Sequence, residues 1–206
     1  MSVKGLLIVV SGPSGAGKGT VMKGILERDP NIRLSISATT RRPRETEQDG
    51  VHYFFKTREE FLALVDKKGF LEYAQVYDQY YGTPRAFVEE QLDAGRDVLL
   101  EIDVQGGMNV KKAFPEAVTV FLAPPSMTEL ERRIRFADTG TRDNIETRLE
   151  WARQEIAQIP RYGYCIVNDD INGSVEALAA IIRAEKLACW RRPELTQNIL
   201  EGAMDQ

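Results

Sequence analysis

The chain has 206 residues, of which 43% are hydrophobic and 28% are charged, as in ordinary globular proteins. Its net charge of −4 argues against a global nucleic-acid binder, because such proteins usually carry a basic excess. Two cysteines and one histidine exclude a disulfide framework, a cysteine-rich zinc site and any site that needs several histidine ligands.

The sequence shows no targeting signal. Only five apolar residues, 6–10, follow the first few residues, which is too short for a signal peptide or a membrane span. A protein with free cysteines and no export signal is typical of the reducing cytosol. We therefore expect a cytoplasmic protein with no membrane partner and no nucleic-acid partner, and the sequence indicates no obligate protein partner.

Short apolar runs without polar alternation predict strands that are buried on both faces, as in a parallel sheet. In chain order they are residues 6–10, 34–38, 98–102, 118–122 and 164–167, of which 34–38 has the weakest pattern. Helical patterns lie between them, so the sequence predicts an α/β fold with a parallel five-stranded core sheet.

Capping residues mark three helix starts. They are the capping box at residues 57–60, the Thr83-Pro84 pair before a helix that Gly95 ends, and a second capping box at residues 126–129.

Two stretches depart from simple alternation of strands and helices. Residues 38–90 contain aromatic-rich short strands, 51–55 and 70–77, and one helix, which predicts a small inserted α+β lobe. Residues 126–158 are helical, rich in arginine and broken around Thr139-Gly140, which predicts a lid. We expect one domain over residues 4–184, followed by a helix end and tail over 185–206.

A glycine-rich segment joins the first predicted strand to a helix. Gly12, four further residues, Gly17 and Lys18 match the spacing of a phosphate-binding P-loop. Glycines let backbone N–H groups turn toward phosphate oxygens, and the lysine adds a positive charge near the β- and γ-phosphates. Gly19 stands where Ser or Thr usually follows the lysine, and Thr20 comes one residue later. The alternative is a glycine-rich turn with a surface lysine.

Further polar residues lie beyond the P-loop. The strand at 98–102 is followed by Asp103, as in the Walker B arrangement that holds Mg²⁺, although many buried strands end in Asp. Arg41, Arg42 and Arg44 form a local basic cluster that suits phosphate, or else a solvated loop. Tyr53, Tyr80 and Tyr81 are either phosphate ligands or core aromatics. Glu72 interrupts an apolar stretch, and its spacing alone favours a solvent-facing position.

Several segments in the same order resemble bacterial guanylate kinases over about residues 5–190. They are SGPSGAGKGT, SISATTRRPR, DGVHYFF, FLEYAQVY, YYGTPR, LLEIDVQG, FLAPPS and YCIVNDD. The resemblance implies the P-loop nucleoside monophosphate kinase fold and transfer of the γ-phosphate of ATP to GMP, with Mg²⁺ as the cofactor and ADP and GDP as products.

The resemblance also implies roles for individual residues. The GMP phosphate would be held by Arg41, Arg44, Tyr53 and Tyr81. Guanine would be read by Glu72 at N1–H and the 2-amino group, by Ser37 at O6, and by Thr83 and Asp103 on the amino side. The ATP site would be formed by Gly12, Pro13, Ser14, Gly15, Ala16, Gly17, Lys18, Gly19, Thr20 and Asn168. Thr20 and Asp103 would hold the metal, partly through water. Lys18, Arg41, Arg133 and Arg148 would be catalytic.

One part of the lid departs from the family pattern. Ala137 stands in place of a usual ATP-side arginine and Asp138 in place of a glycine, so Arg135 or Arg142 would have to substitute, or turnover would be slower. Two other functions remain open from the sequence. One is a guanylate-kinase-like interaction module, against which Lys18 and Asp103 speak, and the other is a kinase for a different nucleotide, against which Glu72 and Ser37 speak.

Overall fold

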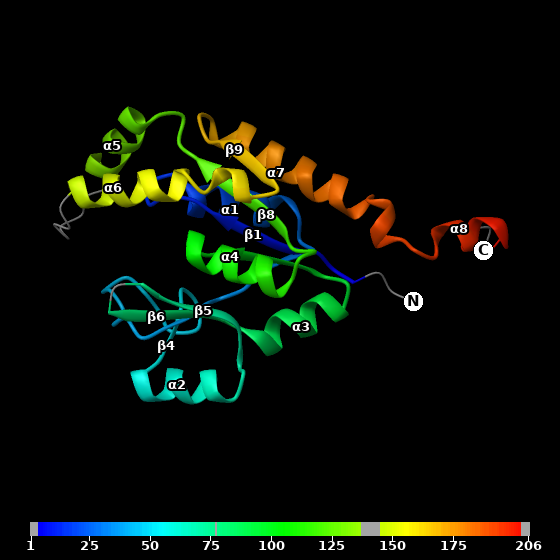
Figure 1. Ribbon diagram of the computed structural model, residues 1–206, viewed down its shortest axis with the longest axis horizontal. Coiled ribbons are helices and arrows are strands. Elements are labelled where there is room, and N and C mark those ends of the chain that lie inside the picture. Colours follow the sequence, from blue (N-terminus) through cyan, green and yellow to red (C-terminus); the bar gives the residue numbers. More distant parts are fainter. Residues whose placement is uncertain (1–3, 77, 137–144, 203–206) are drawn as a thin grey trace.

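The computed structural model describes residues 4–76, 78–136 and 145–202 (Figure 1). Its core is a five-stranded parallel sheet with the strand order β2-β7-β1-β8-β9. The strands are β1 (Leu7–Ser11), β2 (Ile32–Leu34), β7 (Asp97–Glu101), β8 (Val118–Ala123) and β9 (Tyr164–Val167). The parallel five-stranded sheet predicted from the apolar runs is confirmed.

The strand predicted at residues 34–38 is misplaced. β2 ends at Leu34, and after the N–H of Ser35 donates to the Leu99 carbonyl the chain leaves the core sheet. Residues Ala38–Thr39 then form β3 in a different sheet. One apolar run therefore serves two sheets, which a pattern of hydrophobicity cannot separate.

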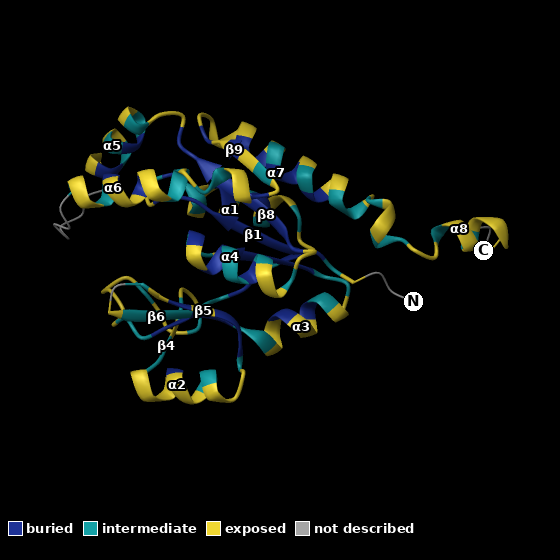
Figure 2. Cartoon of the chain, viewed as in Figure 1, coloured by how far each residue is buried: buried dark blue, intermediate teal, exposed yellow. Residues whose placement is uncertain are grey.

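Helices cover both faces of the core sheet (Figure 1). They are α1 (Lys18–Arg28) and α7 (Ile171–Lys186) on one face, and α3 (Arg85–Asp93) and α4 (Val104–Ala113) on the other. Successive residues of a strand point to opposite faces. Accordingly Ile8 and Val10 pack with α1 and α7, whereas Leu7 and Val9 pack against the α3 and α4 side. All of β1 is buried, as Figure 2 shows, so the loop that follows it has a rigid base.

A second, four-stranded sheet with the order β4-β3-β6-β5 forms a lobe beside the core (Figure 1). Its elements are β3 (Ala38–Thr39), β4 (Phe54–Phe55), α2 (Arg58–Asp66), β5 (Phe70–Val76) and β6 (Gln79–Pro84). Phe61 of α2 stacks on Phe70 with ring centroids 4.4 Å apart, which gives the lobe its own small core. The strand expected at 51–55 is reduced to β4, and of the strand expected at 70–77 residue 77 lies outside the described residues.

The predicted helix caps have different outcomes. Thr57 forms a complete capping box with Glu60 at the start of α2, as predicted. The expected cap at Thr83 is wrong, because α3 begins at Arg85 and the Thr83 hydroxyl donates to Glu72 instead. At α5 (Met127–Phe136) only half of the box forms, since Ser126 accepts from the Glu129 N–H while the Glu129 carboxylate accepts from arginines.

Two helices, α5 and α6 (Ile145–Ile156), pack against each other through Leu130, Ile134 and Leu149. They flank the lid break that the sequence predicts at Thr139-Gly140, which lies outside the described residues. The turn η1 (Ile159–Arg161) leads from α6 to β9. After α7, the short helices η2 (Cys189–Arg191) and α8 (Leu195–Leu200) extend away from the core (Figure 1). None of the described helices is long and apolar enough to cross a membrane.

Candidate active site

The P-loop is the turn from β1 into α1, and its backbone requires glycine at two close approaches. Gly12 has φ 154°, and a Cβ there would lie 2.2 Å from the Leu122 carbonyl oxygen. Gly17, the N-cap of α1, has φ 92°, and a Cβ would lie 2.4 Å from the Asn168 side-chain nitrogen. Glycine is therefore needed at both positions, because any side chain would clash with β8 or with the loop after β9.

Lys18 reaches back across this loop. Its Nζ donates to the carbonyl oxygens of Gly12 at 2.6 Å and Pro13 at 3.2 Å. Burial lowers the pKa of the ammonium, while the nearby carboxylates of Glu101, Glu155 and Asp103 raise it. The positive charge is thus held at the centre of the loop, where the N-terminus of α1 adds its positive dipole end.

Asn168 braces the P-loop from the loop after β9. Its Nδ2 donates to the Ala16 carbonyl at 2.7 Å, and its Oδ1 accepts from the Ser174 hydroxyl at 2.9 Å. The residue is only 1% exposed. Both polar atoms of its amide are therefore engaged in hydrogen bonds within the protein, a structural role that the sequence pattern does not indicate.

One arginine of α5 and one of α6 contact the P-loop side of the core. Nη2 of Arg148, on α6, donates to the Ser14 hydroxyl at 2.9 Å. Nη2 of Arg133, on α5, donates to the Asn168 carbonyl at 3.0 Å. Arg135 pairs with Glu131 on its own helix instead. The proposed substitutions around Ala137, Asp138 and Arg142 lie outside the described residues.

Two acidic residues stand at the carboxyl end of β7. Asp103 caps α4, because its Oδ1 accepts from the Gly106 N–H at 2.8 Å. The sequence interpretation did not include Glu101, although it stands two residues before Asp103 at the end of the same apolar run. Partial desolvation raises the pKa of the Glu101 carboxyl, and the charge of Lys18 opposes that shift.

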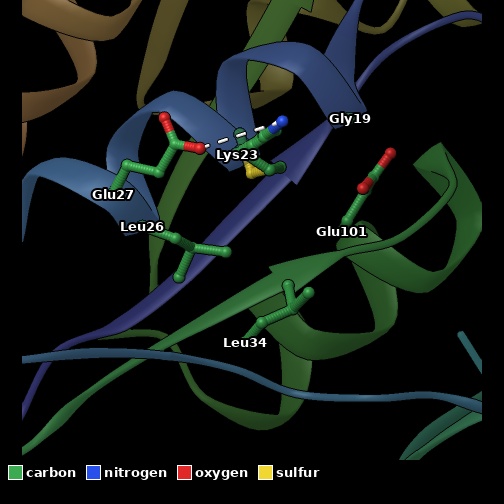
Figure 3. Close-up of a pocket in the computed structure, with 7 residues that line it drawn as sticks. Gly19, Lys23, Leu26, Glu27, Leu34 and Glu101 are labelled. Carbon is green, nitrogen blue, oxygen red and sulfur yellow. Dashed lines mark ion pairs between the residues drawn. The ribbon is translucent and has the colours of Figure 1, made fainter. Parts of the chain in front are cut away.

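Glu101 lies across a pocket from the first turns of α1. Figure 3 shows its carboxylate opposite Gly19, and the Lys23–Glu27 ion pair on the far wall. The pocket has a volume of about 340 Å³ and is lined by Gly19, Met22, Lys23, Leu26, Glu27, Leu34 and Glu101. Thr20, the other predicted metal ligand, is exposed in the same first turn of α1. Among the described residues, no three His, Cys, Asp or Glu side chains are grouped so that they could hold a metal by themselves.

Glu72 lies in the lobe and is buried, with 8% of its surface exposed. The solvent-facing position favoured by spacing alone is therefore wrong. Its Oε1 accepts from the Thr83 hydroxyl at 2.8 Å, and a Cβ on Gly106 of α4 would lie 3.0 Å from its Oε2. Burial raises the pKa of Glu72 to about 7, with a further contribution from the charge of Asp103. Glu72, Thr83 and Asp103 thus come together between β5, β6 and α4.

The arginines and tyrosines of the lobe form a second group. The guanidinium of Arg41 lies 5.5 Å from the ring centroid of Tyr53, which in turn lies 6.1 Å from that of Tyr81. Burial raises the pKa of Tyr53, as do the nearby Tyr81 and the charge of Glu101, so this group lies within electrostatic reach of β7. Tyr80 instead stacks on Phe61 in the lobe core, with ring centroids 5.5 Å apart.

Two predicted GMP ligands have fewer contacts. Arg44 is exposed in the loop after β3, and its backbone N–H donates to Glu47. Ser37 is half-buried at the entrance to β3, and its carbonyl accepts from the Phe54 N–H at 2.9 Å. Glu47, which also pairs with Arg41 at 2.8 Å, was not among the predicted residues.

Comparisons with known proteins point to one family. The guanylate kinase family model matches residues 4–185. The guanylate kinase of Caldanaerobacter subterraneus is 50% identical over 206 residues, which cover 99% of this chain and all of the relative. That of Clostridioides difficile is 51% identical over 183 residues, or 89% of each chain.

A solved structure agrees with these sequence matches. The crystal structure of guanylate kinase from Anaplasma phagocytophilum matches with a TM-score of 0.78 and 37% identity, covering 92% of this chain and 90% of that one. The five-stranded parallel core with its P-loop is thus the nucleoside monophosphate kinase fold. With a family model over nearly the whole chain and relatives at about half identity, the chain belongs to the guanylate kinase family.

Proposed function

We propose that the chain transfers the γ-phosphoryl group of ATP to GMP, giving ADP and GDP. The observation that carries this proposal is the buried carboxylate of Glu72, which lies beside Thr83 and Asp103. Guanine presents two adjacent donors, N1–H and the 2-amino group, to such a carboxylate. Adenine has an acceptor at N1 and no 2-amino group, so it would set an acceptor against the buried carboxylate and offer it no second donor, which disfavours adenine by roughly 10⁴-fold.

The other lobe residues complete the acceptor site in this proposal. Arg41 and Arg44, with Tyr53 and Tyr81, hold the GMP phosphate, because guanidinium and hydroxyl groups donate to its oxygens. Ser37 contacts O6 of guanine. The grouping of Arg41 with the two tyrosines supports this role, since it places a guanidinium beside two phenol rings.

Phosphoryl transfer at this site needs no general base. The acceptor phosphate, with a second pKa near 6, is largely dianionic at neutral pH. The remaining task is to hold donor and acceptor in line and to neutralise charge. In our proposal Lys18, Arg41, Arg133 and Arg148 do this, the P-loop residues 12–20 hold the ATP phosphates, and the backbone around Asn168 borders the adenine.

The acidic residues fit a magnesium ion bound together with ATP. Mg²⁺ in kinases is usually held by one or two protein oxygens plus substrate phosphates and water. Thr20 and Asp103 would hold it, partly through water, and Glu101, whose carboxyl is influenced by the charge of Lys18, adds a second carboxylate at the end of β7. When bound, the ion neutralises charge on the transferring phosphate. Enclosure of the site by the lid would exclude water.

We further propose that residues 4–184 form the kinase domain, with an acceptor lobe over about 38–90 and a lid over about 126–158. The tail over 185–206 then lies outside the catalytic unit. The small-molecule partners are ATP and GMP, and the expected compartment is the cytoplasm.

The proposal is tested by incubating the protein with MgATP and GMP and separating the nucleotides by chromatography. We expect ADP and GDP to form in equal amounts. Binding of GMP without any GDP would overturn the proposal and support the interaction module instead. Nothing among the described residues favours that module, because Lys18 and both acidic residues of β7 and its loop are in place.

A further inference from the structure

A carboxylate inside the loop between β3 and β4 engages two of the basic residues of the acceptor lobe. Oε1 of Glu47 accepts from Nη2 of Arg41 at 2.8 Å, and Oε2 accepts from the backbone N–H of Arg44 at 2.8 Å. Both oxygens of Glu47 are therefore used by the protein. The same side chain links a guanidinium to the backbone of a second arginine three residues along.

This link is more enclosed than an ordinary surface ion pair. The side chains of Glu47 and Arg41 are 13% and 22% exposed, whereas Arg42, Arg44 and Glu45 belong to the exposed residues of the same loop. The hydrogen bond from Arg41 is the main cause that lowers the pKa of Glu47 to about 2, and the Arg44 N–H contributes. Glu47 therefore stays ionised through the whole working pH range and does not release Arg41 by titration.

The guanidinium of Arg41 is held from its other sides as well. It lies over the rings of Tyr53 and Phe55, at 5.5 and 5.9 Å from their centroids, and Nη1 donates to the Arg42 carbonyl at 2.9 Å. Guanidinium carries five N–H donors in a fixed plane. Glu47 and Arg42 each accept from one of them, and the Tyr81 hydroxyl is a further hydrogen-bonding neighbour of the guanidinium. The ion pair with Glu47 thus fixes the orientation in which the guanidinium and Tyr81 meet an anion.

We infer that Glu47 is a positioning residue for the acceptor phosphate, acting through Arg41 and the backbone at Arg44 without touching the substrate. This inference rests on the proposed function, in which Arg41 binds the phosphate of GMP. Both Glu47 oxygens are already engaged by donors, and its charge is offset by Arg41, so it repels the phosphate less than a free carboxylate would. Its effect is to keep a long arginine side chain from losing the orientation that bidentate phosphate binding requires.

The test compares GMP with guanosine, which lacks the phosphate. Glu47→Ala and Glu47→Gln are compared with the exposed neighbour variant Glu45→Gln by isothermal titration calorimetry. We expect both Glu47 variants to bind GMP about tenfold more weakly, the size of one oriented charged contact, and guanosine as before. Glu47→Gln should resemble Glu47→Ala, because the amide nitrogen cannot accept from the second donor. In both Glu47 variants the KM for GMP should also rise, while the KM for ATP stays unchanged.

Two outcomes would overturn the inference. Unchanged GMP affinity in both variants would show that Arg41 needs no partner, and an equal loss of GMP and guanosine would show general damage to the lobe. A double-mutant cycle adds a second criterion: in an Arg41→Ala background, Glu47→Ala should cost clearly less than in the wild type. Failure of the wild-type protein to bind GMP at all would instead contradict the proposed function.

Discussion

At the scale of single residues, Lys18 is the side chain on which the P-loop assignment depends most. Its ammonium is bound to two loop carbonyls and lies among three carboxylates. We expect Lys18→Ala to lower kcat by about 100-fold or more, because one preorganised positive group at the transferring phosphate is lost.

The matched control for this variant is Lys112→Ala, which removes an exposed lysine from the end of α4. Steady-state kinetics with MgATP and GMP measures the effect, and circular dichroism checks that both variants fold. Activity of Lys18→Ala near that of Lys112→Ala would rule out the P-loop as the phosphate site.

Glu72 makes the guanine site sensitive to pH. Its pKa is raised to about 7, chiefly by burial, so the free carboxylate that pairs with N1–H and the 2-amino group is lost as the pH falls through 7. We expect guanosine to bind about tenfold more weakly at pH 6 than at pH 8, because the ionised fraction changes by about that factor. Guanosine is the ligand of choice because it carries no phosphate that titrates in this range.

Calorimetry at several pH values tests this dependence, with Glu72→Gln as the comparison. That variant should bind guanosine weakly and with little change between pH 6 and 8. A flat profile for the wild type would contradict the assigned role of the buried carboxylate.

At the scale of elements, the contact that most affects the stability of the P-loop is the one that links it to the start of α7. Asn168 gives one buried hydrogen bond to Ala16 and receives one from Ser174. We expect Asn168→Ala to lower the free energy of unfolding by about 2 kcal/mol, because it leaves the buried Ala16 carbonyl and Ser174 hydroxyl unpaired. Ser174→Ala should cost about half as much, since it breaks only one of the two bonds.

Urea denaturation measures both variants, and kinetics adds a functional reading. Asn168→Ala should raise the KM for ATP more than the KM for GMP, because the P-loop loses its brace while the lobe is untouched. Equal destabilisation by the two variants, with no change in the KM for ATP, would show that the amide does not support the loop.

The elements also show how far the sequence could lead. The core strands were predictable because they are apolar on both faces, and Thr57 was recognised because its capping box is wholly local. Thr83 was misinterpreted because its hydroxyl bonds to Glu72 on the neighbouring strand, a contact that no local pattern contains. The prediction of one strand over residues 34–38 failed because the chain passes from β2 to β3 there. Both sheets accept apolar residues, so the hydrophobic pattern does not show where the chain changes sheets.

At the scale of the whole molecule, the proposed site is assembled from three parts that are distant in the sequence. In our proposal the core contributes Lys18 and Asp103, and the lobe contributes Glu72 and Arg41. The helices α5 and α6 contribute Arg133 and Arg148, which contact Asn168 and the P-loop residue Ser14. The glycine motif and the resemblance to guanylate kinases predict these residues, and the structure brings Glu72 together with Thr83 and Asp103. The contacts of Glu47 and of the Asn168 amide were not predictable, because both depend on tertiary packing, whereas the position of Glu101 two residues before Asp103 can be read from the sequence.

The net charge of −4 is therefore an average over an acidic body and local arginine clusters. Arg41, Arg42 and Arg44 lie in the loop after β3, and Arg132, Arg133 and Arg135 lie on α5, where they pair with Glu129 and Glu131. An enzyme that binds two nucleotides needs positive charge only where their phosphates lie, so an acidic balance is compatible with this function.

The most direct test of the central claim is the ratio of kcat/KM for GMP to that for AMP, measured with MgATP in a coupled assay. A buried carboxylate that pairs with two guanine donors predicts a preference for GMP on the order of 10⁴. Comparable values for the two nucleotides would contradict the assignment of Glu72 as the guanine-reading residue, and with it the proposed function.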